Sequence, residues 1–322
     1  MKAVTYEQCG QPDVLRLREV ENPVPKDNEV LVKVRAASVN AYDWHILTAD
    51  IFLVRLNRGL LRPKIAILGA DVAGEVEAVG RNVQRFKPGD AVYGCLSVCG
   101  DGAFAEYVCA TENAWVLKPA NLSFEEAAAV PMAAITALQG LRDEGHIQPG
   151  QRVLIHGAAG GVGTFAVQFA KLLGAEVTAV CGTRNVEQAR ALGADHVIDY
   201  TKQDFAKTGQ QYDLILGVNG YRSLAVYRRG LIPKGVYVMA GGKPAQMFQA
   251  LLLGRWMSRG GQKMGVVSAK PNQKDLDFIK GLLEAGKIRP VIDKRYRLAE
   301  TAEALRYLGT GHARGKVVIT VG

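Results

Sequence analysis

The chain has 322 residues, of which 48% are hydrophobic and 22% charged, with a formal net charge of +9. These proportions are typical of a folded protein and exclude a disordered chain, which has few aliphatic residues. At roughly 150 residues per domain, the length suggests two domains. Because the positive charge is spread along the sequence, we expect a solvated surface and an anionic small ligand. Nucleic-acid binding, which the net charge alone would support, is the alternative.

Cysteine usage and the first residues bear on the compartment. Five scattered cysteines are too few for a disulfide framework, so we expect a reducing, cytoplasmic environment. The first residues lack the apolar segment of a signal peptide, and no run reaches the ~18 apolar residues of a membrane-spanning helix. We therefore expect no transmembrane segment.

The part of the chain before Ser123 is predicted to be rich in β-strands. Alternation of apolar and polar residues indicates short strands separated by Gly and Pro turns. The predicted strands cover residues 29–36, 72–80, 91–94 and 105–108. Several short strands with such turns favour a small barrel.

From Ser123 the pattern changes to helices that alternate with apolar strands. Ser123 with Glu125 and Glu126 is typical of a helix N-terminus. Helices are predicted at 164–173, 186–192, 274–285 and 299–308, and strands at 152–156, 176–181, 196–198, 212–216, 235–240 and 316–321. The alternation before residue 266 predicts a parallel sheet.

The strongest single motif is a glycine-rich turn between a predicted strand and a predicted helix. Gly160 would let the backbone approach a pyrophosphate, and Gly163 would let the helix pack against the strand. The start of the helix adds N–H groups and a partial positive charge. The turn therefore predicts a dinucleotide site formed by Ala158, Gly160, Gly161, Val162 and Gly163.

The end of the next strand distinguishes NAD(H) from NADP(H). An NAD site carries Asp or Glu there to bind the ribose hydroxyls, whereas this chain has Thr183 and Arg184. Thr183 can donate to a phosphate and Arg184 can hold one with two hydrogen bonds. With Tyr200 at the edge of the adenosine phosphate pocket, these residues predict NADPH. In the simpler alternative, Arg184 only begins the next helix and Tyr200 only packs there.

These motifs and several further segments resemble the zinc-free quinone oxidoreductase branch of the medium-chain dehydrogenase/reductase superfamily. Within that branch the chain is similar to chloroplast-envelope quinone oxidoreductase homologues. The segments that carry the resemblance occur in family order over essentially the whole chain, at 37–44, 69–74, 86–94, 131–137, 153–163, 192–200 and 315–318.

The resemblance implies an α/β fold with two domains. A GroES-like β-barrel catalytic domain would cover residues 1–122 and be completed by 266–322. A Rossmann domain, with a doubly wound parallel sheet that binds NADP, would cover 123–265. In the family the active site is the cleft where the domains meet. A homodimer is expected because dimers are common in the family.

The resemblance also bears on metal binding. Zinc-dependent members of the superfamily hold a catalytic ion with two Cys and one His. In this chain the matching positions are Asn40, Ala70 and the cysteine-free segment 131–137. Cys95, Cys99 and the other cysteines also lack the spacing of a structural zinc loop. We therefore expect no metal.

The resemblance places candidate catalytic and cofactor residues. Asn40 would lie where the nicotinamide meets the substrate, and its amide would donate to the acceptor oxygen or orient the nicotinamide ribose. Thr136 would begin the helix that faces the nicotinamide. Lys316, in a matching segment, is assigned to cofactor binding.

Two neighbours of Asn40 are weaker candidates for a proton donor, because solvent alone can protonate an enolate. They are Tyr42, which we include among the catalytic residues, and His45. Asp43 is interpreted as a local hydrogen-bonding residue.

Without zinc, reduction of an electron-poor acceptor by NADPH is the expected reaction. A quinone and an α,β-unsaturated carbonyl (a 2-alkenal or an enone) both fit, because negative charge develops on an oxygen that hydrogen-bond donors stabilise. The corresponding activities are of EC 1.6.5 or 1.3.1 type. The alternative is an NADPH-binding interaction or structural protein on the same fold with little turnover.

Three segments depart from the family pattern. Residues 217–220 replace a more usual acidic segment after the preceding strand. Residues 51–65 are apolar and basic and are predicted to form a flap over the substrate. Residues 247–263 are predicted to line the substrate pocket or a subunit contact. Peripheral contact with an anionic membrane is a further alternative for such apolar and basic segments.

Overall fold

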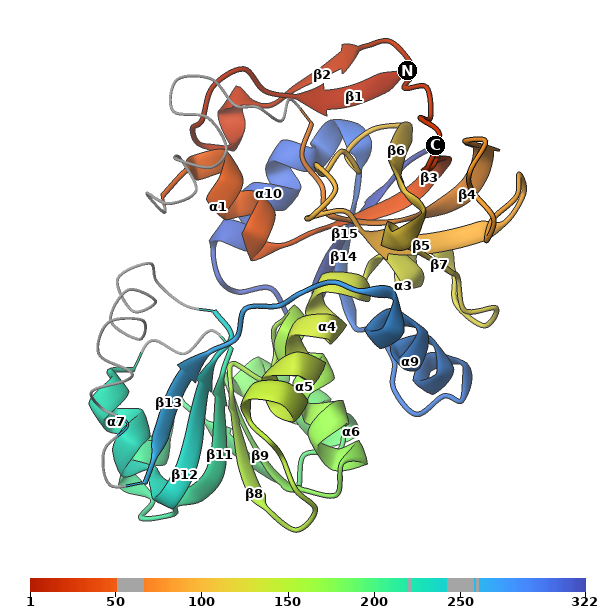
Figure 1. Ribbon diagram of the computed structural model, residues 1–322. Coiled ribbons are helices and arrows are strands. Elements are labelled where there is room, and N and C mark those ends of the chain that lie inside the picture. The colour runs from red at the N-terminus through yellow and green to blue at the C-terminus, as the bar shows by residue number, and fades with distance from the viewer. Residues whose placement is uncertain (51–66, 219–221, 242–257, 259–260) are drawn as a thin grey trace. The chain divides into compact units, whose positions relative to one another are not determined.

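A computed structural model describes residues 1–50, 67–218, 222–241, 258 and 261–322 (Figure 1). The chain divides into two compact units. Unit 1 comprises residues 1–132, 271–286 and 290–322, and unit 2 comprises 133–270 and 287–289. The predicted flap at 51–65 and most of the segment 247–263 lie outside the described residues.

A seven-stranded sheet is the frame of unit 1. Its strands follow the order β14-β15-β3-β4-β5-β7, and β6 pairs with β3. Their bounds are β3 (Glu29–Val39), β4 (Asp71–Val79), β5 (Ala91–Cys95), β6 (Tyr107–Thr111), β7 (Trp115–Leu117), β14 (Ile292–Arg297) and β15 (Lys316–Thr320). A separate two-stranded sheet pairs β1 (Lys2–Thr5) with β2 (Arg16–Glu19).

The predicted alternation in β3 is confirmed. Val30, Val32 and Val34 are buried, and the residues between them are half-buried. This period of two puts the valines on the face that joins the apolar core of unit 1. The core also contains Phe104 and Trp115, both fully buried.

The helices of unit 1 are α1 (Ala41–Thr48), α3 (Phe124–Ala128), α9 (Gln273–Glu284) and α10 (Thr301–Gly309). The predicted helix start at Ser123 is confirmed by reciprocal hydrogen bonds. The Glu126 N–H donates to Ser123 Oγ at 3.2 Å, and the Ser123 N–H donates to the Glu126 carboxylate at 2.8 Å. This pattern satisfies two backbone donors that a helix start otherwise leaves open.

A six-stranded parallel sheet is the frame of unit 2, as the alternation of strands and helices predicted (Figure 1). The sheet has the order β10-β9-β8-β11-β12-β13. The bounds are β8 (Arg152–His156), β9 (Glu176–Cys181), β10 (His196–Asp199), β11 (Tyr212–Gly217), β12 (Leu231–Met239) and β13 (Lys263–Val266). Counted along the chain, this is the doubly wound order 3-2-1-4-5-6, in which ligands bind where the order reverses. Here the reversal lies between β8 and β11.

Helices connect these strands. They are α4 (Pro131–Gln139), which runs from unit 1 into unit 2 and continues as a π-helical segment η3 (Gly140–Glu144), α5 (Gly161–Leu172), α6 (Val186–Ala191) and α7 (Leu224–Arg229). Short 3-10 segments are η1 (Pro12–Val14), η2 (Glu112–Ala114), η4 (Thr183–Asn185), η5 (Phe205–Lys207) and η6 (Leu298–Glu300).

Candidate active site

The glycine turn joins the end of β8 to the start of α5 in unit 2. Gly160 precedes the helix, which begins without a hydrogen bond from a capping side chain. The first N–H groups of an α-helix have no partner within the helix. A Cβ on Gly160 would meet only Gly157 O, at 3.9 Å. The turn therefore presents backbone donors beside open space, and an anionic pyrophosphate fits it.

The other predicted residues of the turn shape its backbone. A Cβ on Gly163 would come within 2.1 Å of Gly157 O, so only glycine lets α5 pack this close to the turn. Ala158 is buried, and its N–H donates to Val180 O on β9 at 3.1 Å. The remaining two predicted residues, Gly161 and Val162, are half-buried in the first turn of α5.

The predicted phosphate pocket lies at the ends of β9 and β10. Thr183 and Arg184 are exposed in η4, directly after β9. Tyr200 follows β10 and lies against Gly182, because a Cβ on Gly182 would be 3.1 Å from the Tyr200 hydroxyl. The structure thus brings Thr183 and Tyr200 to one place, with Arg184 next in the chain.

Asp199 is a carboxylate at this place that the sequence analysis missed. It ends β10 and pairs with Cys181, which ends β9. Thr183 Oγ1 donates to Asp199 Oδ2 at 2.7 Å, and Thr201 Oγ1 donates to Asp199 Oδ1 at 2.8 Å. The bond from Thr183 is the main cause that lowers the pKa of Asp199. A charged carboxylate therefore adjoins the predicted phosphate pocket.

In unit 1 the ends of three neighbouring strands bring Asn40, Asp71 and Lys316 together. Because β3 is antiparallel to both neighbours, it ends where β4 and β15 begin. Lys316 Nζ lies 3.2 Å from Asp71 Oδ2 in an ion pair whose side chains are 4% and 0% exposed. Asp71 also accepts from Ser38 Oγ at 3.2 Å and from the Met132 N–H, in the first turn of α4, at 3.0 Å.

The carboxamide of Asn40 is bound at both ends. Its Nδ2 donates to Asp71 Oδ2 at 3.0 Å and to Ser38 O at 3.3 Å. Its Oδ1 accepts a hydrogen bond from Lys316 Nζ. An amide nitrogen carries two hydrogens and its oxygen has two acceptor positions. Both N–H groups therefore have protein acceptors. Asn40 is also the N-cap residue of α1, where its side chain faces the Asp43 N–H in a capping box without a full side-chain hydrogen bond, so the oxygen keeps one acceptor position.

Tyr42 and Asp43, on the first turn of α1, also form hydrogen bonds within unit 1. The Tyr42 hydroxyl is 3.1 Å from Ser97 O and 3.3 Å from Asp101 Oδ2. Asp43 is fully buried, and its Oδ2 accepts from the Asn40 N–H at 2.8 Å. Burial, reinforced by the negative charge of Asp101, raises the pKa of Asp43 to about 8. The local hydrogen-bonding role predicted for Asp43 is confirmed.

Thr136 and His45 are the other two residues predicted for the site. Thr136 lies on α4, in unit 2, and is 7% exposed. His45 forms an ion pair with Asp50, with Nδ1 2.8 Å from Oδ1.

His156 ends β8 immediately before the glycine turn. Its Nδ1 lies 2.7 Å from the Tyr227 hydroxyl. Burial, with a smaller contribution from the positive charge of Arg222, lowers the pKa of His156 to about 4. The imidazole is therefore neutral at physiological pH and adds no charge beside the turn.

Potential metal ligands do not gather in the described part of the chain. No group of three or more His, Cys, Asp or Glu residues in that part is arranged to hold a metal ion. Burial raises the pKa of the Cys95 thiol, and the Asp71 carboxylate raises it further. The Cys95 side chain is therefore a neutral thiol near neutral pH.

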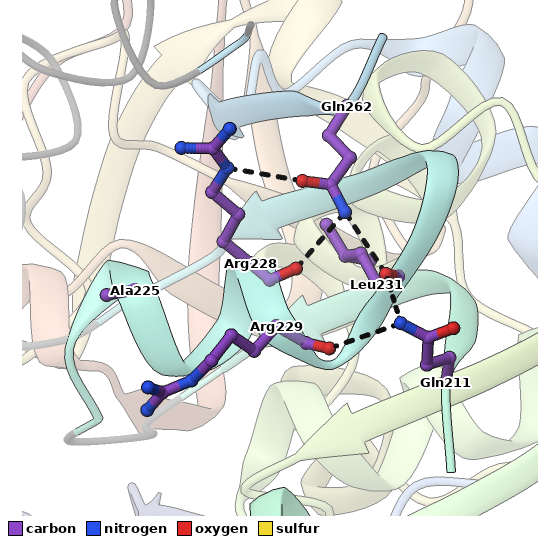
Figure 2. Close-up of a pocket in the computed structure, with 6 residues that line it drawn as sticks. All are labelled: Gln211, Ala225, Arg228, Arg229, Leu231 and Gln262. Atoms are coloured by element: carbon purple, nitrogen blue, oxygen red, sulfur yellow. Dashed lines mark hydrogen bonds between the residues drawn. The ribbon is translucent and has the colours of Figure 1, made fainter. Parts of the chain in front are cut away.

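A cavity of about 510 Å³ lies in unit 2 at the amino ends of β11, β12 and β13 (Figure 2). The Gln262 amide donates to Arg228 O and to Leu231 O, each at 3.1 Å, and the Gln211 amide donates to Leu231 O at 3.2 Å. These hydrogen bonds connect the residues that precede β11 and β13 to the first residue of β12 and to the end of α7. The glycine turn follows the carboxyl end of β8, so the cavity belongs to the other edge of the sheet. We do not assign it to the cofactor.

The two units define the class of protein, and the comparisons with known proteins agree. Residues 26–120 match the alcohol dehydrogenase GroES-like domain, and residues 192–319 match the zinc-binding dehydrogenase family. The chain belongs to the medium-chain dehydrogenase/reductase superfamily. Proteins named as quinone oxidoreductases and as NAD(P)H oxidoreductases are among its relatives. The predicted family and fold class are confirmed.

Three relatives show the extent of the similarity. The chloroplast envelope quinone oxidoreductase homolog of Arabidopsis thaliana is 35% identical over 99% of this chain and 98% of that protein. The 2-methylene-furan-3-one reductase of Solanum lycopersicum is 35% identical over 99% of this chain and 79% of that protein. The solved quinone oxidoreductase of Coxiella burnetii is 32% identical, with a TM-score of 0.90 over 100% of this chain and 99% of that one.

Helix length bears on the membrane question. None of the helices in the described residues combines enough length with enough apolar character to cross a bilayer.

Proposed function

We propose that the chain is a zinc-independent, NADPH-dependent oxidoreductase that transfers hydride to a quinone or to an α,β-unsaturated carbonyl. The observation that carries this proposal is the uncapped start of α5, where backbone donors meet open space at the reversal of a doubly wound sheet. The names of two kinds of relative support the two proposed classes of acceptor. The Arabidopsis and Coxiella proteins are named as quinone oxidoreductases, and the tomato enzyme is named for an enone.

The bound cofactor supplies the hydride, and the residues of the chain bind and orient it. We assign the pyrophosphate to the first N–H groups of α5, and the nicotinamide end to Asn40 and Thr136. Because His156 is neutral, it adds no charge at the turn. The partial positive charge at the start of α5 is then what attracts the pyrophosphate.

For the adenosine 2′-phosphate we assign Thr183, Arg184 and Tyr200. The Thr183 hydroxyl already donates to Asp199, so it must rotate to reach a phosphate. The charge of Asp199 also opposes a second anion. Arg184 is therefore expected to provide most of the preference for NADPH, because a guanidinium can bind a phosphate with two charge-assisted hydrogen bonds.

Zinc independence is proposed from the residues at the three family positions. Asn40 is engaged by Asp71 and Lys316, Ala70 is fully buried, and the segment 131–137 has no cysteine. The described residues offer an ion pair and an amide here, and neither Ala nor a carboxamide of this kind is a typical zinc ligand.

The experiment is oxidation of NADPH by purified, chelator-treated protein. The acceptors are an alkyl vinyl ketone, a 2-alkenal, a benzoquinone and phenanthrenequinone, with NADH in parallel. We expect turnover with NADPH preferred and no effect of the chelator. Asn40→Ala should lower turnover, whereas Asn82→Ala, at an exposed position outside the cluster, should not.

The outcomes separate the two candidate functions. Turnover of the enone or enal identifies a double-bond reductase, and turnover of quinones alone identifies a quinone reductase. Tight NADPH binding with no turnover of any acceptor would contradict the proposal and favour a binding protein on the same fold.

A further inference from the structure

The cluster at the ends of β3, β4 and β15 is more elaborate than a single cofactor contact requires. A lysine, an aspartate and a serine, each at most 4% exposed, surround the Asn40 carboxamide. Burying an ion pair is costly unless hydrogen bonds satisfy both partners. Here Asp71 accepts from the side chains of Ser38, Asn40 and Lys316 and from the Met132 N–H. Such a satisfied polar cluster fixes its members in one arrangement.

The arrangement determines what Asn40 can offer to a ligand. Both of its N–H groups donate to Asp71 and Ser38, and its oxygen accepts from Lys316. Reversing the amide would place Nδ2 against the Lys316 ammonium and Oδ1 against the Asp71 carboxylate, so the opposite orientation is disfavoured electrostatically. The remaining hydrogen-bonding capacity is one acceptor position on Oδ1. Asn40 can therefore receive a hydrogen bond but has no N–H left for an acceptor oxygen.

We infer that Asp71 and Lys316 are positioning residues that act through Asn40, holding its carboxamide oxygen as an acceptor for a ribose hydroxyl on the nicotinamide side of the cofactor. This inference rests on the proposed function. It assigns to Lys316 a role different from the direct cofactor contact predicted from the sequence. It also selects ribose orientation from the two roles predicted for Asn40.

Lys316 is the residue that separates positioning from direct contact. Its ammonium is buried against Asn40 and Asp71. If it acts through Asn40, its removal should matter only when Asn40 is present and only for ligands with a nicotinamide ribose. A lysine that contacts the pyrophosphate should instead matter for every ligand that contains one, whatever stands at position 40.

The experiment measures binding by calorimetry, with NADPH, 2′-phospho-ADP (which keeps the pyrophosphate and lacks the second ribose and the nicotinamide) and 2′,5′-ADP as ligands. The variants are Lys316→Met, Asn40→Ala and the combination of both. Arg35→Met is the matched control, because Arg35 on β3 pairs with Glu75 on β4 in the same sheet, at 38% and 40% exposure. NADPH oxidation is followed in the same proteins.

We expect Lys316→Met to weaken NADPH binding roughly tenfold, the loss of about one good hydrogen bond. Binding of 2′,5′-ADP should change less than about twofold. In the Asn40→Ala background, Lys316→Met should cause no further loss, because residues acting through one group are not additive. Lys316→Arg, which keeps the charge, should restore part of the NADPH affinity.

Lys316→Met leaves Asp71 charged and buried, which can impair folding. The double variant Asp71→Asn with Lys316→Met removes both charges and is the folded comparison, checked by circular dichroism. It should show the same loss for NADPH and the same intact binding of 2′,5′-ADP.

Three results would overturn the inference. Losses that multiply in the Asn40→Ala background would show that Lys316 contacts the cofactor itself. Equal weakening of NADPH and 2′-phospho-ADP by Lys316→Met would place Lys316 on the pyrophosphate. A wild-type protein that binds none of the ligands would contradict the proposed function and, with it, this inference.

Discussion

Asp43 is a buried carboxyl group whose protonation state affects the stability of the protein and the backbone at Asn40. Its carboxylate accepts a hydrogen bond from the Asn40 N–H. Burial raises the pKa of Asp43, and the carboxylates of Asp101 and Asp71 add to this rise. The positive charge of Lys316 lowers the pKa in part. The native state therefore favours the protonated acid near neutral pH. Because Asp43 accepts from the backbone N–H of Asn40, the N-cap residue of α1, its protonation is coupled to the candidate site.

The pH dependence of stability follows from this shift. The pKa of Asp43 is about 8 in the folded chain and about 3.9 in an unfolded one. Between these values the folded state holds a proton that the unfolded state releases, so this group favours folding at low pH and loses that contribution as pH rises towards 8. Asp43→Asn, a neutral substitute, should flatten the pH dependence of the urea midpoint. The variant should be more stable than wild type at pH about 9.

Asp27→Asn is the control for this experiment, since Asp27 forms an exposed pair with Arg81. It should leave the shape of the stability curve unchanged. Parallel curves for wild type and Asp43→Asn would contradict the assignment of the proton to Asp43.

Arg184 carries the second prediction at this scale. Arg184→Ala should weaken NADPH binding about tenfold or more and leave NADH binding within about twofold, because only NADPH has the additional phosphate. Fluorescence titration measures both affinities. Arg190→Ala, on α6 and paired with Glu187 at the surface, is the matched control. Equal loss of both cofactors would remove Arg184 from the phosphate pocket.

At the scale of elements, helix and strand termini assemble both candidate half-sites. In unit 2 the start of α5 and the ends of β9 and β10 provide the donors. In unit 1 the end of β3 and the starts of β4 and β15 provide the cluster. Termini serve this purpose because their backbone groups are open and their side chains lie at the edge of a sheet.

The two glycines of the turn predict opposite phenotypes. Alanine at Gly163 would force a Cβ to within 2.1 Å of Gly157 O, whereas alanine at Gly160 has room, with Gly157 O 3.9 Å away. Gly163→Ala should therefore lower the melting temperature of the protein by several degrees, as overpacking by about 1–3 kcal/mol does. Gly160→Ala should keep the melting temperature and weaken NADPH binding, since its methyl group occupies the space assigned to the pyrophosphate.

Calorimetric melting and titration test this pair directly. A Gly160→Ala protein that binds NADPH as wild type does would contradict the assignment of the pyrophosphate to this turn.

The sequence predicted the local elements well because their signals are local. Alternation located β3, and the strand, turn and helix around Gly160 were recognisable within one short segment. The contacts across the sheet were not recognisable in this way. Asp71 and Lys316 are 245 positions apart in the chain, and only strand pairing brings them to Asn40. Asp199 was missed for a similar reason. It lies on β10, and only the pairing of β10 with β9 brings its carboxylate to Thr183.

At the scale of the whole molecule, the two units divide the proposed tasks. Unit 2 carries the residues assigned to the phosphates and Thr136, and unit 1 carries the carboxamide assigned to the nicotinamide ribose. The net charge of +9 accords with an anionic cofactor, and it predicts that NADPH affinity falls with added salt.

The most direct test of the central claim follows a labelled hydride. Chelator-treated protein is given an alkyl vinyl ketone or a benzoquinone and NADPH deuterated at the carbon that donates the hydride, and products are analysed by mass spectrometry. We predict that one NADPH is oxidised for each acceptor reduced. Deuterium should appear on the β-carbon whenever the ketone is reduced, and removing or adding zinc should have no effect. Activity that disappears on chelation and returns with zinc, or NADPH binding without reduction of either acceptor, would contradict the account.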